Sequence, residues 1–210
     1  MYDIYPKSFH FFQERKHGRK KAVDLMRAKV DLLWELHHIE RRMLTPKGIF
    51  ASKVYGYELM LAELFSEGIL EELSETALGI LSIAIVYEPR KRITKPRLSR
   101  QAKDLEAITT RVLRDISRRE HKMRVYPASK ACEFHLAPAM EGWLKGESFD
   151  KILHSTDVDE GEVVRYFRMA IQILREILDT PVSDQAKAKI YNLLRLINRD
   201  VIDSEKQLRS

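Results

Sequence analysis

Apolar side chains recur every three or four residues along most of this 210-residue chain, which is the spacing of one face of an α-helix. A long regular stretch covers residues 162–178. Its apolar stripe consists of Val164, Phe167, Ile171, Leu174 and Leu178. A second stripe at the same spacing is polar and contains Arg165, Arg168, Gln172, Arg175 and Glu176. The pattern predicts a long amphipathic helix with one face in the core and a row of cations on another.

The same periodicity predicts a helical bundle for most of the chain. Helices are expected over residues 22–40, 50–67, 74–87, 101–119, 129–145, 148–154 and 183–205. Gly68 and Gly146 mark helix ends, because glycine readily takes a positive φ, and Ser148 is expected to cap the helix that follows it. The pair 50–67 and 74–87 is the most apolar part and should form the centre of the core. The predicted fold class is therefore all-α.

A proline-containing segment interrupts the helical pattern after the central pair of helices. Pro89 and Pro96 predict a loop from residue 88 to about residue 100. The loop concentrates the basic residues Arg90, Lys91, Arg92, Lys95 and Arg97. Phosphate contacts are one interpretation of this charge, and a solvated basic loop is the other.

The N-terminal quarter of the chain has a different organisation. A helix is followed by Thr45-Pro46-Lys47-Gly48, which predicts a turn, and then by a new helix. Winged-helix units commonly end in this way. We therefore divide the chain into residues 1–50, a linker with a partial winged-helix segment, and residues 51–210, the helical bundle.

Composition restricts the class of protein. The chain is 44% hydrophobic and 32% charged, with little glycine or proline, which is typical of a globular helical domain. A single cysteine, Cys132, excludes an internal disulfide and favours a reducing compartment. The longest apolar run, LGILSIAIVY, is shorter than the roughly 20 residues that cross a bilayer. No signal peptide opens the chain, so we expect a soluble, cytoplasmic protein with no membrane partner.

The positive charge is unevenly distributed. The net charge is +6, but residues 1–124 carry +8 and residues 125–210 carry −2. Such an asymmetry favours a surface that binds nucleic acid, because basic side chains that neutralise phosphates release counterions. A lysine-rich solvated face is an equally good interpretation of the composition alone.

Recognisable catalytic and metal-binding motifs are absent. The sequence has no phosphate-binding loop, no dinucleotide-binding glycine pattern, no nucleophile elbow and no H-E-x-x-H zinc motif. Cys132 and His135 have a C-x-x-H spacing, but no second pair completes a zinc site. The acidic residues between 157 and 162 are best explained as helix capping. We therefore expect no catalytic residue, no metal and no cofactor in this chain.

Two separated stretches resemble one protein family. Residues 56–92, GYELMLAELFSEGILEELSETALGILSIAIVYEPRKR, are similar to the opening of the DSHCT-type C-terminal domain of the superkiller and exosome-associated DExH-box RNA helicases. Residues 143–178 resemble the family's W-x-x-G-x-S-F and T-D-x-x-E-G-x-x-V/I-R motifs, followed by a long helix. The run NRDVID at 198–203 is similar to its closing segment.

This resemblance implies an accessory domain of an ATP-dependent RNA helicase. In the family, an all-α bundle lies against two motor domains and completes a channel for single-stranded RNA, which a long "ratchet" helix lines. Here that helix would be 162–178, with Arg165 and Arg168 in the channel-facing row and Gln172 one turn further on. Since both motor domains are missing, we expect no ATPase activity from this chain alone. The implied partners are single-stranded RNA and helicase motor domains, in cis or in trans.

Two other functions remain open at this point. One is a freestanding winged-helix and bundle protein that binds duplex DNA as a regulator, and the other is a protein-interaction scaffold. For nucleic acid, the candidate binding residues are Arg165, Arg168, Gln172, Arg175, Arg90, Arg92 and Lys95.

Overall fold

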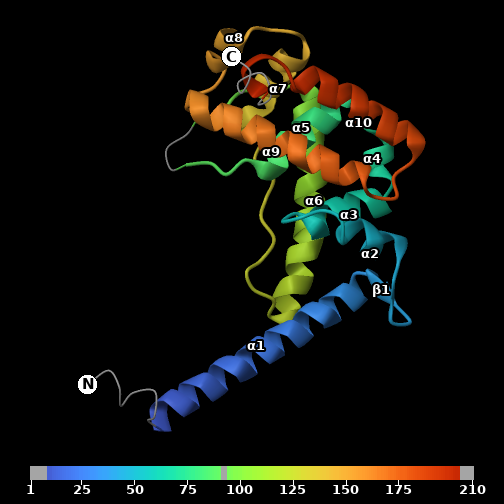
Figure 1. Ribbon diagram of the computed structural model, residues 1–210, viewed down its shortest axis with the longest axis vertical. Coiled ribbons are helices and arrows are strands. Elements are labelled where there is room, and N and C mark those ends of the chain that lie inside the picture. The colour runs from blue at the N-terminus through green and yellow to red at the C-terminus, as the bar shows by residue number, and fades with distance from the viewer. Residues whose placement is uncertain (1–8, 91–93, 204–210) are drawn as a thin grey trace.

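The computed structural model describes residues 9–90 and 94–203, with side chains from Lys20 onward. This part of the chain forms ten α-helices, two short 3-10 helices and one small antiparallel hairpin (Figure 1). The helices are α1 (Phe9–Glu35), α2 (Pro46–Ala51), α3 (Glu58–Ser66), α4 (Ile69–Glu72), α5 (Glu75–Val86), α6 (Arg100–Met123), α7 (Ala137–Leu144), α8 (Phe149–Leu153), α9 (Glu160–Leu178) and α10 (Asp184–Ile197). The strands are β1 (Ile39–Glu40) and β2 (Met43–Leu44), and the 3-10 helices are η2 (Phe134–Leu136) and η3 (Asp200–Ile202). The prediction of an all-α bundle is confirmed.

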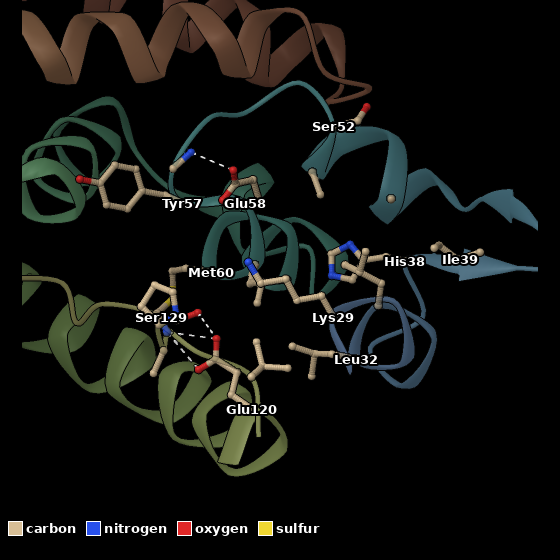
Figure 2. Close-up of a pocket in the computed structure, with 18 of the residues that line it drawn as sticks. Lys29, Leu32, His38, Ile39, Ser52, Tyr57, Glu58, Met60, Glu120 and Ser129 are labelled. Carbon is tan, nitrogen blue, oxygen red and sulfur yellow. Dashed lines mark hydrogen bonds between the residues drawn. The ribbon is translucent and has the colours of Figure 1, made fainter. Parts of the chain in front are cut away.

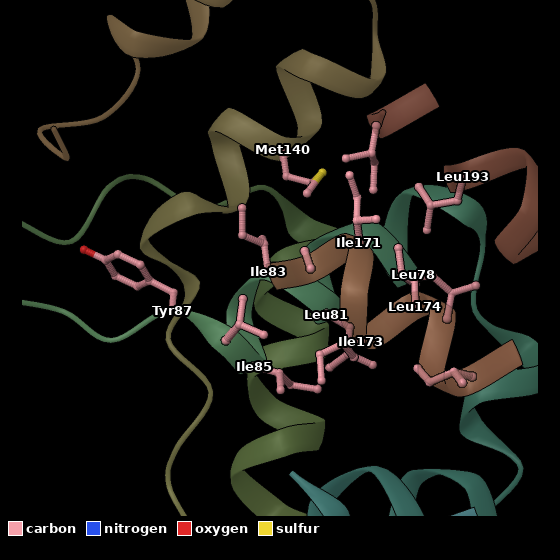
Figure 3. Close-up of a cluster of buried hydrophobic side chains, with 14 of the residues drawn as sticks. Leu78, Leu81, Ile83, Ile85, Tyr87, Met140, Ile171, Ile173, Leu174 and Leu193 are labelled. Atoms are coloured by element: carbon pink, nitrogen blue, oxygen red, sulfur yellow. The ribbon is translucent and has the colours of Figure 1, made fainter. Parts of the chain in front are cut away.

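Helix α5 is the centre of the bundle. Every residue from Ala77 to Val86 is buried, which is typical of a helix surrounded by other helices on all sides. Helices α7, α9 and α10 pack around it. Figure 3 shows side chains of these four helices meeting in one apolar cluster. Members labelled there include Leu78, Ile83, Met140, Ile171 and Leu193.

The long helix α9 buries a wider face than its predicted apolar stripe. Phe167, Ile171 and Leu174 are buried as expected, whereas Val164 and Leu178 are only partly buried. The buried face extends to Val163, Tyr166, Ala170, Ile173 and Ile177. This widening arises because α9 packs against both α5 and α10.

Serine caps set where several helices begin. The hydroxyls of Ser74, Ser99, Ser148 and Ser183 each accept a hydrogen bond from the amide three residues later. Such a bond satisfies one of the amides that lack a partner within the helix. The expected cap at Ser148 is confirmed.

Several predicted helices have different bounds in the structure. The stretch 50–67 is broken between α2 and α3, where Gly56 takes a φ of 87°. The expected helix 129–145 begins only at Ala137, since the amide of Glu133 donates to the carbonyl of Ala84 and holds that segment along α5. The last helix ends at Ile197, whose carbonyl accepts from the Trp143 indole at 2.9 Å.

Helix α1 projects from one end of the bundle as an arm (Figure 1). It begins before the expected residue 22 and ends at Glu35, not at residue 40. Its attachment to the bundle lies near its C-terminal end, where Leu32 and Leu36 pack on Val125. Glu35 is also ion-paired with Arg119 on α6 at 3.6 Å.

The hairpin β1–β2 connects this arm to α2. Thr45 caps α2, and its hydroxyl also donates to the His37 carbonyl at 2.7 Å. Gly48 lies so close to the His38 backbone that an added Cβ would be 2.0 Å from the His38 carbonyl oxygen. The predicted turn therefore needs glycine at position 48 because of this close approach.

Candidate nucleic-acid interface

The outward face of α9 carries the predicted row of polar side chains. Arg165, Gln172 and Arg175 are exposed, and Arg168 is partly buried. A hollow of about 370 Å³ lies along this face. It is lined by Gly161, Val164, Arg165, Arg168, Met169 and Gln172. The row therefore has a shallow concavity beside it.

Arg168 is held by the C-terminal part of the chain. Its Nε donates to the Ile202 carbonyl and its Nη2 to the Val201 carbonyl, both at 3.1 Å. These bonds attach η3 to α9. Sequence reasoning missed this structural role, since nothing local to Arg168 indicates which carbonyls lie beside it.

Arg165 and Arg90 meet at one carboxylate. The Glu162 Oε1 lies 3.0 Å from the Arg90 Nη2 and 3.4 Å from the Arg165 Nη2. Arg90 also contacts the Asp159 carboxylate at 3.3 Å. The guanidinium of Arg165 lies 4.5 Å from the centroid of the Tyr166 ring, a cation–π arrangement. Two predicted site residues from distant segments are thus neighbours.

The remaining candidates are placed differently. Lys95 is ion-paired with Glu106 on α6. The amide of Gln172 donates to Glu176 at 3.1 Å, and Glu176 also accepts from the Tyr55 backbone amide. Arg175 is exposed and has no ion pair within the described residues. Arg92 lies outside the residues that the structure describes.

A second, larger cavity lies where the arm joins the bundle. Its volume is about 590 Å³, and its walls come from α1, the hairpin, α2, α3, α6 and residues 125–130 (Figure 2). Apolar side chains such as Leu32, Ile39 and Met60 dominate the lining. Because separated segments build it, periodicity along the chain gave no signal for it.

Two buried polar side chains line this cavity. Neither ring nitrogen of His38 has a hydrogen-bond partner within the described part of the chain. Burial, helped by nearby Lys47, lowers the pKa of His38 to about 4, so its ring is neutral at pH 7. The Glu120 carboxylate is satisfied by the Ser129 amide at 3.0 Å and hydroxyl at 2.7 Å (Figure 2).

Other chemistry-bearing groups remain apart. Burial raises the pKa of the Cys132 thiol to about 12, so it is not an activated nucleophile. Within residues 9–90 and 94–203, no three His, Cys, Asp or Glu side chains are arranged to hold a metal ion. None of the helices described here has the length and apolar character needed to cross a bilayer.

Together these features define the class of the protein: an all-α domain with a central helix buried from Ala77 to Val86 and a long amphipathic helix that exposes a cationic face. The chain belongs to the DSHCT (NUC185) domain family, which matches residues 41–205. The resemblance seen in the sequence is thereby confirmed.

Relatives of the chain are named as RNA helicases. It is 24% identical over 156 residues to the ATP-dependent RNA helicase mtr4 of Schizosaccharomyces pombe, covering 71% of this chain and 14% of the relative. It is 26% identical over 157 residues to the antiviral helicase SKI2 of Saccharomyces cerevisiae, covering 70% of this chain and 12% of the relative. The exosome RNA helicase MTR4 of Homo sapiens is 24% identical to the chain over 153 residues, covering 69% of this chain and 14% of the relative. The chain thus spans only about a seventh of the length of these relatives.

Proposed function

We propose that this chain acts as an accessory domain of a DExH-box RNA helicase and binds single-stranded RNA along α9. The observation that carries the proposal is the cationic row beside the hollow on the outward face of α9. Family membership and the helicase relatives support it. The chain itself is expected to have no ATPase activity.

The chemistry of this face suits a strand's backbone more than its bases. Arginines at 165 and 175, with Gln172 between them, offer donors along one side of a helix. Such contacts hold phosphates without reading sequence, and their strength falls as salt rises. Arg168 is expected to contribute mainly through its positive charge, since its nitrogens already donate to η3.

We further propose that the cavity at the base of α1 belongs to the surface that docks on the motor domains. Leu44, which lines the cavity, is exposed, and so are Met43 and Ile49 on the neighbouring β2 and α2. An apolar patch of this kind usually marks an interaction site. Helicase motors are the occupant that family membership favours, because the chain matches so small a part of its helicase relatives. A cytoplasmic location is part of the same proposal.

Fluorescence anisotropy with a labelled oligouridine tests RNA binding directly. We expect weak binding that falls with salt, and no hydrolysis of ATP. Replacing Arg165 and Arg175 by alanine should reduce the log–log salt slope by about 0.7 for each phosphate that is no longer neutralised. Arg195→Ala, which removes an exposed arginine from α10, is the control and should leave the slope nearly unchanged.

Other outcomes would favour other functions. Tighter binding to a duplex DNA than to the single strand would favour the regulator. No binding to any nucleic acid at low salt would contradict the proposal and favour the interaction scaffold.

A further inference from the structure

We infer that Glu162 sets the affinity of the proposed RNA site by competing with phosphate for two arginines, Arg165 of α9 and Arg90 of the loop after α5. This inference rests on the proposed function and adds two residues, Glu162 and Arg90, to its site. The motif form T-D-x-x-E-G-x-x-V/I-R leaves position 162 unspecified, so the resemblance assigns Glu162 no role.

The first step is geometric. One oxygen of Glu162 lies 3.0 Å from the Arg90 guanidinium and 3.4 Å from that of Arg165. The side chain of Glu162 is 18% exposed, whereas those of Arg90 and Arg165 are 62% and 56% exposed. The carboxylate is therefore held at the helix surface while both cations remain open to solvent and to a strand.

The second step concerns the loop that carries Arg90. Figure 1 shows this green segment passing beside one end of the orange helix α9. Arg90 reaches Asp159 and Glu162 there, and the Thr94 amide donates to the Asp157 carboxylate at 3.0 Å. The Tyr166 hydroxyl also donates to the Glu88 carbonyl at 3.2 Å, two residues before Arg90, so this backbone stays next to α9 when Glu162 gives up Arg90. Arg90 and Arg165 then face the same side as two donors of one site.

The third step is electrostatic. A phosphate can replace the Glu162 carboxylate as the partner of a guanidinium, because both present anionic oxygens to its N–H groups. A strand that contacts Arg90 or Arg165 must displace this carboxylate or share the cation with it. Both arginines of these pairs are more than half exposed, so water and salt screen the attraction; displacement is feasible but lowers the net gain from each phosphate that binds.

Glu162→Gln tests the inference because it removes the charge and keeps the shape. We expect about two- to tenfold tighter binding to oligouridine. The salt slope should become steeper by about 0.7 for each arginine that newly neutralises a phosphate. Glu160→Gln is the matched control. It changes the net charge equally in the same helical turn, and Glu160 has no ion pair within the part of the chain that the structure describes.

Two further variants separate the roles of the arginines. Arg90→Ala combined with Glu162→Gln should show a smaller gain in affinity than Glu162→Gln alone, because only Arg165 is then released. Glu162→Asp, which retains the charge, should bind more weakly than Glu162→Gln. A purely structural role of Glu162 would lower stability without raising either the affinity or the salt slope.

The outcomes distinguish this inference from the function on which it rests. If the wild-type chain binds oligouridine and Glu162→Gln binds no tighter than Glu160→Gln, the inference is wrong and the proposed function stands. If the double variant with Arg90→Ala and Glu162→Gln gains as much affinity as Glu162→Gln alone, Arg90 does not belong to the site. If the wild type and every variant fail to bind, both the function and the inference are overturned.

Discussion

The guanidinium of Arg168 donates to the carbonyl oxygens of Val201 and Ile202, each at 3.1 Å, and so attaches η3 to α9. In the same row, Arg165 extends into solvent and contacts Glu162 and Tyr166, which belong to its own helix. Two arginines three residues apart thus have different principal roles. Arg168 holds the C-terminal segment against α9, whereas Arg165 is exposed and, in the described part of the chain, makes contacts only within its own helix.

Arg168→Ala is expected to destabilise the protein. Alanine cannot donate to the partly buried carbonyls of Val201 and Ile202, so these two groups lose the Arg168 hydrogen bonds. The free energy of unfolding should therefore fall by about 1–3 kcal/mol. Urea denaturation followed by circular dichroism measures this change. Arg165→Ala should alter that free energy by less than about 0.5 kcal/mol while weakening RNA binding. Equal stabilities of the two variants would contradict the assignment.

Trp143→Phe should also destabilise the bundle. The Trp143 indole is fully buried and donates to the Ile197 carbonyl at 2.9 Å, and the Arg199 guanidinium lies 3.5 Å from the centroid of its ring. Phenylalanine loses the donor and leaves a small void, so we expect a loss of about 2–3 kcal/mol in unfolding free energy.

The control for this variant is Trp34→Phe. Trp34 lies on the arm α1 and is 40% exposed, so its replacement should change stability by no more than about 0.5 kcal/mol. If Trp143→Phe lost no more stability than this control, the buried indole bond would be unimportant.

The protein should lose stability on mild acidification through His38. Folded His38 takes up a proton only near its lowered pKa of about 4, whereas in the unfolded chain it does so near 6.5. Between these values the unfolded state binds more protons, so stability falls as the pH falls. The pKa shift corresponds to about 3 kcal/mol of folding stability. This stability is fully present above pH 6.5 and is lost as the pH falls to about 4.

Comparison with His38→Leu isolates this contribution. The difference in unfolding free energy between wild type and variant, measured in urea from about pH 7.5 to about pH 4, should decrease by up to that amount. A difference that stays constant with pH would show that His38 does not titrate in the predicted way.

Cys132 should react slowly with thiol reagents. Burial raises its pKa to about 12 from an ordinary 9.0, so at pH 8 the thiolate is about a thousandfold scarcer than in an exposed cysteine. A chromogenic aromatic disulfide should modify the native protein slowly and the urea-unfolded protein quickly. Rapid modification of the native state would contradict the burial of this thiol.

The core of the fold could be predicted from local pattern. Helices α5, α6, α8 and α9 were expected close to their observed positions, since apolar periodicity and serine caps act within one segment. Residues 129–136 could not be assigned correctly, because their backbone is held by the Ala84 carbonyl, about fifty residues away in sequence. Helix signals in a sequence do not include such distant acceptors.

The candidate site was predictable only in part. Spacing alone indicated that Arg165 and Arg168 share a face of one helix. It could not indicate that Arg168 donates to η3 or that Arg90 meets Arg165 at Glu162, because those contacts join segments far apart in sequence. The cavity beside His38 was missed for the same reason.

The narrow attachment of α1 has a mechanical consequence. About 23 residues of this helix extend beyond Leu32, a length of roughly 35 Å at 1.5 Å per residue. A rotation of only about 5° at the joint formed by Leu32, Leu36 and Val125 would therefore move the distal tip by about 3 Å, if the helix stays rigid. Substitutions at this joint that change the angle of α1 should therefore displace its far end by more than they displace the bundle.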